Sequence, residues 1–224
     1  MNLSHATTVA ASRLRVLIPL ALFLLLTACS DPPPNYQPLG PDAVVLAFGD
    51  SVTHGTGANR GEDFPTLLAE ETGWQIINAG VPGDTASKAR GRIKGLLQEH
   101  APELVIVELG GNDFLRRQPA GQVKEHLREI ITTVRQSGAI PVLMAVPEFS
   151  VFGATLGSLS DSPIYEELAE EEQILLIDDI FSEVLSADHL RADRIHPNAR
   201  GYRQLADGIA EALTRAGLKY QTDP

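Results

Sequence analysis

The 224-residue chain has a single cysteine, Cys29, one tryptophan and two methionines, and aromatic residues make up only 5% of it. One cysteine cannot form an intrachain disulfide, which excludes the folds that are held together by disulfides. Basic residues are also scarce: 18 Lys and Arg stand against 29 Asp and Glu, for a formal net charge of −11. Nucleic-acid binding usually needs a basic face, so we expect no nucleic-acid partner.

Long apolar runs are missing too. The run Val16–Leu26 is too short to span a bilayer comfortably, and it follows Arg13 and Arg15 as the core of a signal peptide would. It ends in Leu26-Thr27-Ala28-Cys29, which resembles a bacterial lipobox. We therefore expect residues 1–28 to be a lipoprotein signal peptide and Cys29 to carry the lipid anchor, facing the periplasm. Ser30, where an aspartate would favour the inner membrane, favours the outer one. A plain secretory peptide with an incidental cysteine is the alternative.

The next segment, residues 29–42, contains five prolines in the twelve residues from Ser30 to Pro41, which predicts an extended tether. Residues 43–218 then alternate apolar strand-like runs with helical periodicity, and residues 219–224 form a tail. The predicted strands are 43–48, 75–78, 104–109, 140–146 and 174–177, and the predicted helices are 64–72, 85–100, 123–136, 165–172 and 200–216. This alternation predicts an α/β fold with a five-stranded parallel sheet covered by helices on both faces, a three-layer, flavodoxin-like arrangement.

Polar motifs follow these strands, at the edge of the sheet where α/β proteins bind ligands. They are Gly49-Asp50-Ser51, Gly80, Gly110-Gly111-Asn112-Asp113 and Asp193-Arg194-Ile195-His196. Each alone is weak, because a capping turn, a glycine turn or a surface ion pair explains it equally well. Together they offer a nucleophile, oxyanion donors, a base and a group that orients the base, which is the set needed for acyl transfer through a serine.

In these four blocks the chain resembles the SGNH hydrolases, also called the GDSL esterase/lipase family, over about residues 44–212. The resemblance is strongest to its bacterial branch of thioesterases, lysophospholipases and arylesterases. It implies Ser51 as nucleophile, His196 as general base and Asp193 as its partner. It also implies an oxyanion hole formed by the backbone N–H groups of Ser51 and Gly80 and the side chain of Asn112.

No metal or organic cofactor is implied, and no set of His, Asp and Glu has convincing metal-ligand spacing. We expect a monomer that acts on acyl esters or thioesters. The apolar loop after the fourth strand is expected to border the acyl site. The residues expected to bind substrate are Phe114, Leu115, Phe149, Phe152 and Ile195.

Two other functions stay open at this point. An O-deacetylase of cell-envelope polysaccharide would use the same chemistry, because fold does not choose the substrate. The low aromatic content argues against a carbohydrate site. A non-catalytic binding lipoprotein is disfavoured, because Ser51, Asn112, Asp193 and His196 are all present.

Overall fold

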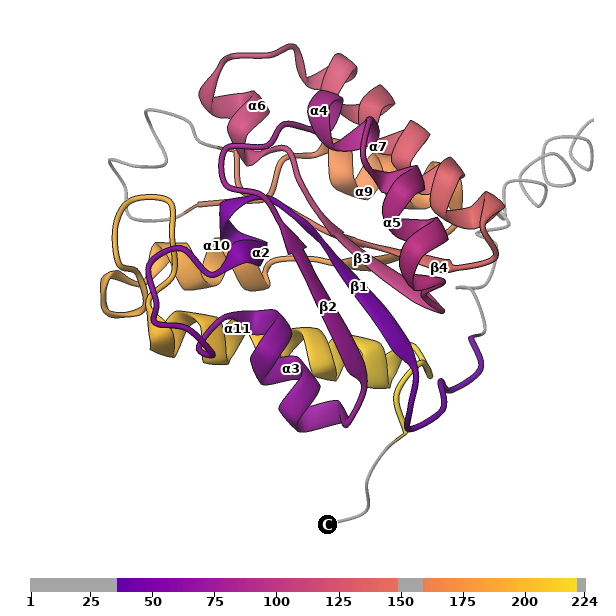
Figure 1. Cartoon of the computed structure of the whole chain (residues 1–224). Helices are drawn as coiled ribbons and strands as arrows, with labels where there is room; N and C mark the ends of the chain where they lie inside the picture. Colours follow the sequence, from indigo (N-terminus) through magenta and orange to yellow (C-terminus); the bar gives the residue numbers. More distant parts are fainter. Residues whose placement is uncertain (1–35, 149–158, 221–224) are drawn as a thin grey trace, which may run out of the picture. The chain divides into compact units, whose positions relative to one another are not determined.

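The computed structural model describes residues 36–148 and 159–220, all of which belong to one compact unit. In this described part, one sheet contains five parallel strands in the order β2-β1-β3-β4-β5 (Figure 1). The strands are β1 (Val44–Gly49), β2 (Gln75–Gly80), β3 (Leu104–Glu108), β4 (Ile140–Met144) and β5 (Leu175–Ile177). The predicted five-stranded parallel sheet is confirmed.

Helices cover both faces of the sheet, which confirms the predicted three layers (Figure 1). One face carries α4 (Ala86–Arg90), α5 (Ile93–His100), α7 (Ala120–Gln136) and α9 (Ile164–Glu172). The other carries α3 (Phe64–Thr72), α10 (Ile180–Ser186) and α11 (Ala199–Arg215). The short helices α2 (Ser51–His54) and α6 (Gly111–Leu115) directly follow strands, and a 3₁₀ turn, η1 (Asp188–Leu190), precedes the last motif.

The register of the sheet brings the motifs to one edge. Gly49, the last residue of β1, is paired with Gly80 of β2 on one side and with Glu108 of β3 on the other. The chain segments that follow these three strands therefore leave the sheet side by side. This is why residues 51, 80 and 112, far apart in the sequence, can serve one site.

The predicted helix 85–100 is instead two helices, α4 and α5, and the prediction was wrong at its centre. Arg92 interrupts it, because its guanidinium turns inward and donates to the carbonyl oxygens of Gly49 and Ala79 at 2.8 and 2.9 Å. It also pairs with Asp84 at 2.8 Å and lies 4.2 Å from the centre of the Phe48 ring. One arginine thus ties the ends of β1 and β2 together, and the side chain of Thr85 caps α4.

The expected tether also joins the fold earlier than residue 43. The hydroxyl of Tyr36 accepts a hydrogen bond from the backbone N–H of Leu175, and the N–H of Leu39 donates to the carbonyl of Leu218 at 2.9 Å. Leu39 is buried. Cys29, Phe149 and Phe152 lie outside the described residues. Among those described, no helix is both long and apolar enough to cross a bilayer.

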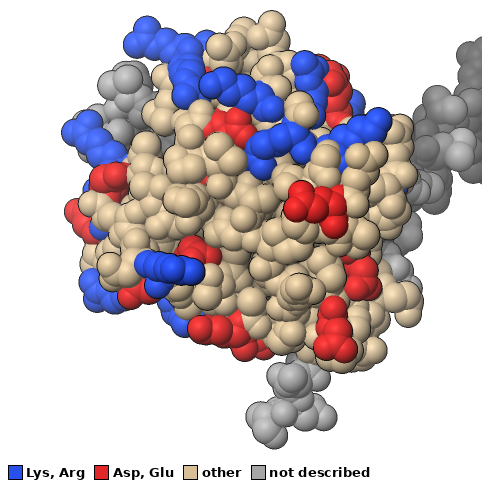
Figure 2. All heavy atoms as spheres, viewed as in Figure 1, with Lys and Arg blue, Asp and Glu red and all other residues tan. Residues whose placement is uncertain are grey.

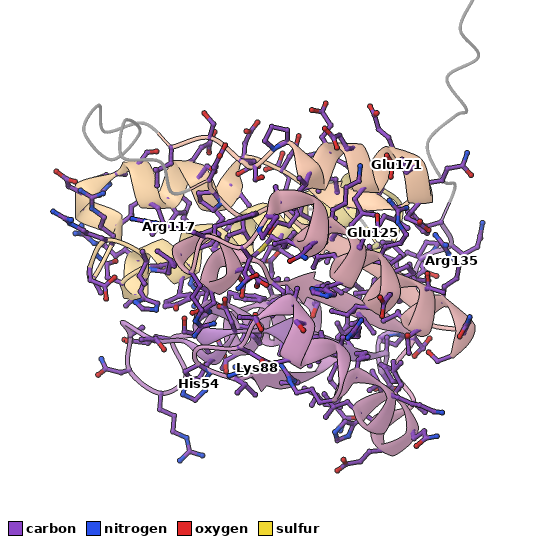
Figure 3. All side chains as sticks on the ribbon, turned by 90° about the horizontal axis from the view of Figure 1, so that it is seen from above. His54, Lys88, Arg117, Glu125, Arg135 and Glu171 are labelled. Atoms are coloured by element: carbon purple, nitrogen blue, oxygen red, sulfur yellow. The ribbon has the colours of Figure 1, made fainter. Side chains whose placement is uncertain are left out.

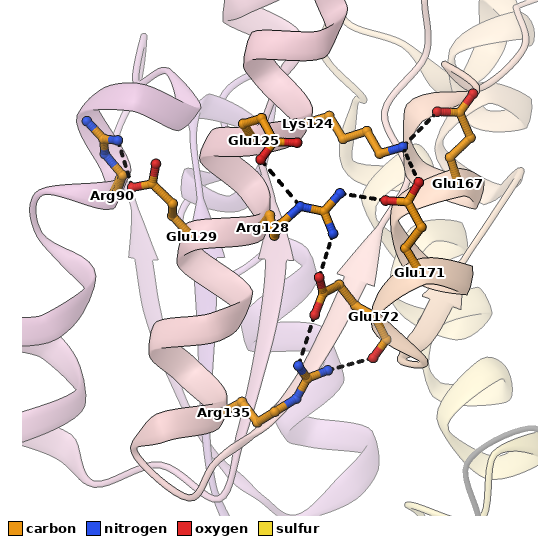
Figure 4. A network of polar contacts seen from close by, with 9 residues as sticks. All are labelled: Arg90, Lys124, Glu125, Arg128, Glu129, Arg135, Glu167, Glu171 and Glu172. Carbon is orange, nitrogen blue, oxygen red and sulfur yellow. Dashed lines mark hydrogen bonds and ion pairs between the residues drawn. The ribbon is translucent and has the colours of Figure 1, made fainter.

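Helix α9 is held on α7 by a network of ion pairs (Figure 4). Lys124 of α7 pairs with Glu167 and Glu171 of α9, both at 2.8 Å. Arg128 bridges Glu171 and Glu172, and Arg135 contacts Glu172 again at 2.9 Å. A network of this kind fixes the direction of α9, whereas a single exposed pair would contribute little.

Candidate active site

Ser51, His196 and Asp193 form a continuous hydrogen-bonded chain. Nε2 of His196 lies 2.9 Å from the Oγ of Ser51, and Nδ1 lies 2.8 Å from Oδ2 of Asp193. Of the His196 side chain, 12% is exposed, against 55% for Asp193. The histidine is thus held between a serine and a carboxylate with one ring nitrogen for each, the geometry by which a base activates a hydroxyl nucleophile.

Local structure explains how each side chain reaches this place. Strand β1 delivers Ser51 to the first position of α2, whose preceding residue Asp50 caps the helix by accepting from the N–H of Val52 at 3.1 Å. On the other segment, Oδ1 of Asp193 accepts from the N–H groups of Ile195 and His196 at 2.8 and 2.9 Å. This tight turn folds His196 back over its own aspartate.

The charge of Asp193 is stabilised by these contacts. Partial burial by itself would raise the pKa of Asp193, but the hydrogen bonds from His196 and Ile195 outweigh it and lower the pKa below its ordinary value. The carboxylate therefore stays ionised well into the acid range. An ionised Asp193 can keep the Nδ1 proton of His196 in place and leave Nε2 free to accept from Ser51.

Asn112 approaches from the segment after β3. Gly110 has φ of 124°, and a Cβ there would lie 2.1 Å from the hydroxyl oxygen of Tyr165, so only glycine fits this turn. The turn presents the Asn112 amide to Asp50, whose Oδ2 accepts from Nδ2 at 2.8 Å. The amide group has two N–H bonds, and one of them remains for a ligand.

The expected donor Gly80 is occupied in this structure. Its backbone N–H donates to Oδ1 of Asn78 at 3.0 Å, and a Cβ on Gly80 would lie 2.2 Å from the backbone nitrogen of His54. Glycine is therefore needed here so that α2 can pack against β2. Three residues on, Gly83 has a positive φ of 79°, and no hydrogen bond of its N–H is found among the described residues.

Sequence reasoning missed the part played by Glu108, which is completely buried behind the nucleophile turn. Its Oε2 accepts from Thr53 Oγ1 at 2.9 Å, from the N–H of Thr53 at 3.3 Å and from the N–H of Asp50 at 3.5 Å. Burial, with the nearby Asp50 carboxylate, raises the pKa of Glu108 well above its ordinary value. We therefore treat Glu108 as neutral and as an anchor for the start of α2.

A crevice opens at Ser51, with a cavity of about 20 Å³ in the described part of the protein. Leu115 and Ile195 line it, as expected for substrate-binding residues, and so do Val146 and Phe181. Phe114 does not line it, because its ring packs edge-on against Tyr165, with 6.4 Å between ring centres. Val146 could have been predicted as a crevice residue, because it ends a predicted strand. Phe181 could not, because it lies on a helix too short to show periodicity.

The described residues contain no cluster of three or more His, Cys, Asp or Glu side chains suited to a metal ion. The reactive groups that the crevice contains are those of Ser51, His196 and the carboxylates. Their arrangement can generate a nucleophile, stabilise a negative oxygen and shuttle a proton.

Comparison with known proteins gives consistent matches. The model of the GDSL-like Lipase/Acylhydrolase family matches residues 47–204. Thioesterase 1/protease 1/lysophospholipase L1 of Escherichia coli (strain K12) is 34% identical over 174 residues, which are 75% of this chain and 82% of that protein. An arylesterase of Vibrio mimicus is 29% identical over 205 residues, which are 89% of this chain and 98% of that protein.

Solved structures agree in fold. The crystal structure of AlinE4, an SGNH-hydrolase family esterase, is 32% identical and superposes with a TM-score of 0.59 over 80% of this chain and 98% of that one. The family expected from the four motifs is the family that these comparisons return.

Proposed function

Because the chain belongs to the GDSL-like Lipase/Acylhydrolase family and is an ester-hydrolysing enzyme, we propose that it cleaves acyl esters or thioesters through a covalent acyl-enzyme on Ser51. The observation that carries this proposal is the chain of hydrogen bonds from Ser51 Oγ through His196 to Asp193, at 2.9 and 2.8 Å. A serine outside such a chain is a weak nucleophile.

The reaction follows from the geometry. Ser51 Oγ attacks the carbonyl carbon while Nε2 of His196 takes its proton, and the imidazolium then gives that proton to the leaving alcohol or thiol. Asp193 holds Nδ1–H and stabilises the imidazolium. A water molecule, deprotonated by the same histidine, attacks the acyl-enzyme and releases the acid, which regenerates Ser51.

The developing oxyanion would be held by the Ser51 N–H and by the free N–H of the Asn112 side chain. A third donor would come from the loop after β2. Gly80 could supply it only by releasing Oδ1 of Asn78. The expected role of Gly80 thus competes with a hydrogen bond already made.

The walls of the crevice favour an acyl chain as the group next to Ser51. Val146, Phe181 and Ile195 are apolar, and Leu115, 47% exposed, sits at the rim. A sugar ring would need several hydrogen-bonding side chains in this position, so the O-deacetylase of envelope polysaccharide is the second candidate. The names of the E. coli and V. mimicus relatives support the acyl-ester reading.

We also propose that the enzyme works as a monomer in the bacterial cell envelope, anchored through a lipid on Cys29 and facing the periplasm, with the outer membrane favoured. Two features of the sequence support this: the lipobox-like Leu26-Thr27-Ala28-Cys29 after an apolar run, and the proline-rich segment that follows. Two or three acyl chains on one cysteine would hold the protein firmly at a membrane, whereas one would not.

The proposed chemistry is tested by hydrolysis of p-nitrophenyl esters from acetyl to palmitoyl. Ser51→Ala should lower kcat by roughly a thousandfold or more, while Ser137→Ala, at the end of α7, should leave it unchanged. Activity on medium and long chains supports the lipolytic reading, and activity confined to acetate favours the deacetylase. Full activity of a folded Ser51→Ala protein would overturn the serine mechanism.

A further inference from the structure

A second cavity, much larger than the crevice at Ser51, lies on the other side of α6. It has a volume of about 540 Å³, is bordered by α4, the C-terminal end of α6 and the first turns of α7, and is open to solvent, since Lys88, Arg116 and Gln122 are exposed. The short helix α6 separates the two spaces: Asn112 and Leu115 line the crevice, while Asp113 and Arg116 line the cavity. A volume of this size is in the range of small-molecule sites.

The cavity is basic, although the whole chain is acidic. Lys88 of α4 lines it, and no acceptor for its amino group is found among the described residues. One terminal nitrogen of Arg116 donates to the carbonyl oxygen of Gly83 at 3.1 Å. The other N–H groups of the guanidinium can donate to a ligand. Figure 2 shows further Lys and Arg side chains on the part of the surface where Figure 1 places α4, α6 and α7.

The lining also contains one carboxyl group, Asp113, which offsets part of the positive charge of Lys88 and Arg116. Asp113 is buried, and its Oδ2 accepts from the N–H of Ala86 at 2.9 Å, which ties α6 to the first residue of α4. This contact holds α6, with Arg116 directly after it, beside α4, which carries Lys88. The remaining polar lining includes the amides of Gln118 and Gln122, which can donate to an anion.

His126 adds an independent sign that the wall is incomplete. Its ring lines the cavity, yet Nδ1 is buried and finds no hydrogen-bond partner within residues 36–148 and 159–220. A buried polar atom without a partner is destabilising, so such atoms are uncommon in protein interiors. A polar ligand that shifts this ring would remove the cost.

We propose that this cavity is a binding site for a phosphate group, held by Lys88 and Arg116 with the help of the glutamine amides. Phosphate suits the set because it offers several acceptor oxygens to a point charge and to a planar guanidinium at once. The group could belong to a free phosphate ester or to the ester substrate itself. In the second case the ester would have to reach past α6, from the cavity to the crevice at Ser51. Only this second source depends on the proposed function.

Binding is measured first, without any reaction. Titration calorimetry of the full protein with glycerol 3-phosphate and with inorganic phosphate should give affinities that weaken with added salt. Lys88→Gln and Arg116→Gln should each weaken binding at least tenfold. Arg117→Gln is the matched control, because Arg117 is exposed, does not line the cavity and is seen well apart from Lys88 in Figure 3. Equal binding by all three variants, or none by the unmodified protein, overturns the proposal.

The source of the phosphate is then decided by two esters with the same acyl chain, a 1-acylglycerol 3-phosphate and the neutral 1-acylglycerol. If the phosphate belongs to the substrate, Lys88→Gln should lower the ratio of kcat/KM between the charged and the neutral ester about tenfold, and Arg117→Gln should not. If calorimetry shows the site but this ratio does not change, the ligand is a free phosphate ester. If the unmodified protein hydrolyses neither ester, that result counts against the proposed function. The binding of phosphate measured by calorimetry would not be affected.

Discussion

At the scale of single residues, the most informative side chain is Glu108. It is a fully buried carboxyl at the end of β3, beside the buried carboxyl of Asp50, and both pKa values are raised, chiefly by burial. Two adjacent carboxylates cannot both be ionised at low cost in such a place. If Glu108 carries the proton, Asp50 stays ionised, and its carboxylate accepts from the side chain of Asn112 and the N–H of Val52.

A raised pKa in the folded state makes stability depend on pH. The contribution of Glu108 is fully present below its unfolded pKa of about 4.3 and is lost as pH rises through its folded pKa. Glu108→Gln should therefore flatten the decline in stability above pH 5, measured as urea midpoints up to pH 9. Glu170→Gln, an exposed carboxyl on α9, is the control and should keep the wild-type slope. Parallel slopes for wild type and Glu108→Gln would refute the neutral carboxyl.

The role of Asn112 in the oxyanion hole can be tested separately from that of the nucleophile. Asn112→Ala should reduce kcat by on the order of a hundredfold or more, with a much smaller change in KM, because a donor to the oxyanion acts mainly in the transition state. Steady-state kinetics on one p-nitrophenyl ester, alongside a thermal melt, measures this. A loss of only a few-fold in kcat would remove Asn112 from the oxyanion hole.

At the scale of elements, the site depends on how closely α2 packs on β2. A Cβ on Gly80 would come within 2.7 Å of the Cα of His54 and closer still to its nitrogen, so the backbone of α2 itself would have to move. Ser51 is the first residue of that helix. Gly80 is thus required for packing, independently of any hydrogen bond from its N–H.

Gly80→Ala should therefore reduce both stability, by about 1–3 kcal/mol, and kcat/KM, because the displaced helix carries the nucleophile. Gly95→Ala is the matched control. It lies inside α5 with no atoms within 4 Å of its would-be Cβ, and it should raise stability by about 0.5–1 kcal/mol at unchanged activity. Denaturant unfolding and ester kinetics on the two variants separate these outcomes; equal behaviour would contradict the packing argument.

At the scale of the whole molecule, the net negative charge bears on how the protein meets a membrane. The net charge of −11 gives no general attraction to anionic lipid, so we expect attachment to a membrane to come from the lipid on Cys29. Membrane attachment and catalysis would then be independent. The lipid on Cys29 would determine where the enzyme is located, and the residues at the edge of the sheet would carry out the reaction.

Cys29→Ser should move the protein from the detergent phase to the aqueous phase in detergent partitioning of expressing bacteria, and should abolish labelling with radioactive palmitate. Ser30→Ala keeps the cysteine and should leave both results unchanged. Esterase activity of the released protein should remain. A Cys29→Ser protein that still partitions into detergent would show that another segment holds it at the membrane.

Much of this protein can be predicted from its sequence, because the signals are local. Apolar periodicity in the sequence predicts strands and long helices. Helix α3 begins and ends where the sequence predicts, and α7 begins three residues earlier than predicted. The motifs of Ser51 and Asn112 directly follow strands, and in a parallel sheet the carboxyl ends of strands lie at one edge. Ser51 and Asn112 could therefore be assigned to one place from the sequence, whereas His196, which follows α10 and η1, was assigned by the resemblance of its motif.

Only the tertiary structure decided which groups meet across that edge. Arg92 breaks a helix because two strand carbonyls lie within its reach, Asn78 takes the N–H of Gly80, and Glu108 is buried beside Asp50. Asn78 is only two residues from Gly80, but the partners of Arg92 and Glu108 are far away in the sequence, and those contacts depend on strand order and register, which local periodicity does not contain. The sequence by itself determined the elements and the reacting groups, and long-range packing determined their hydrogen bonds, their charges and the cavity beside them.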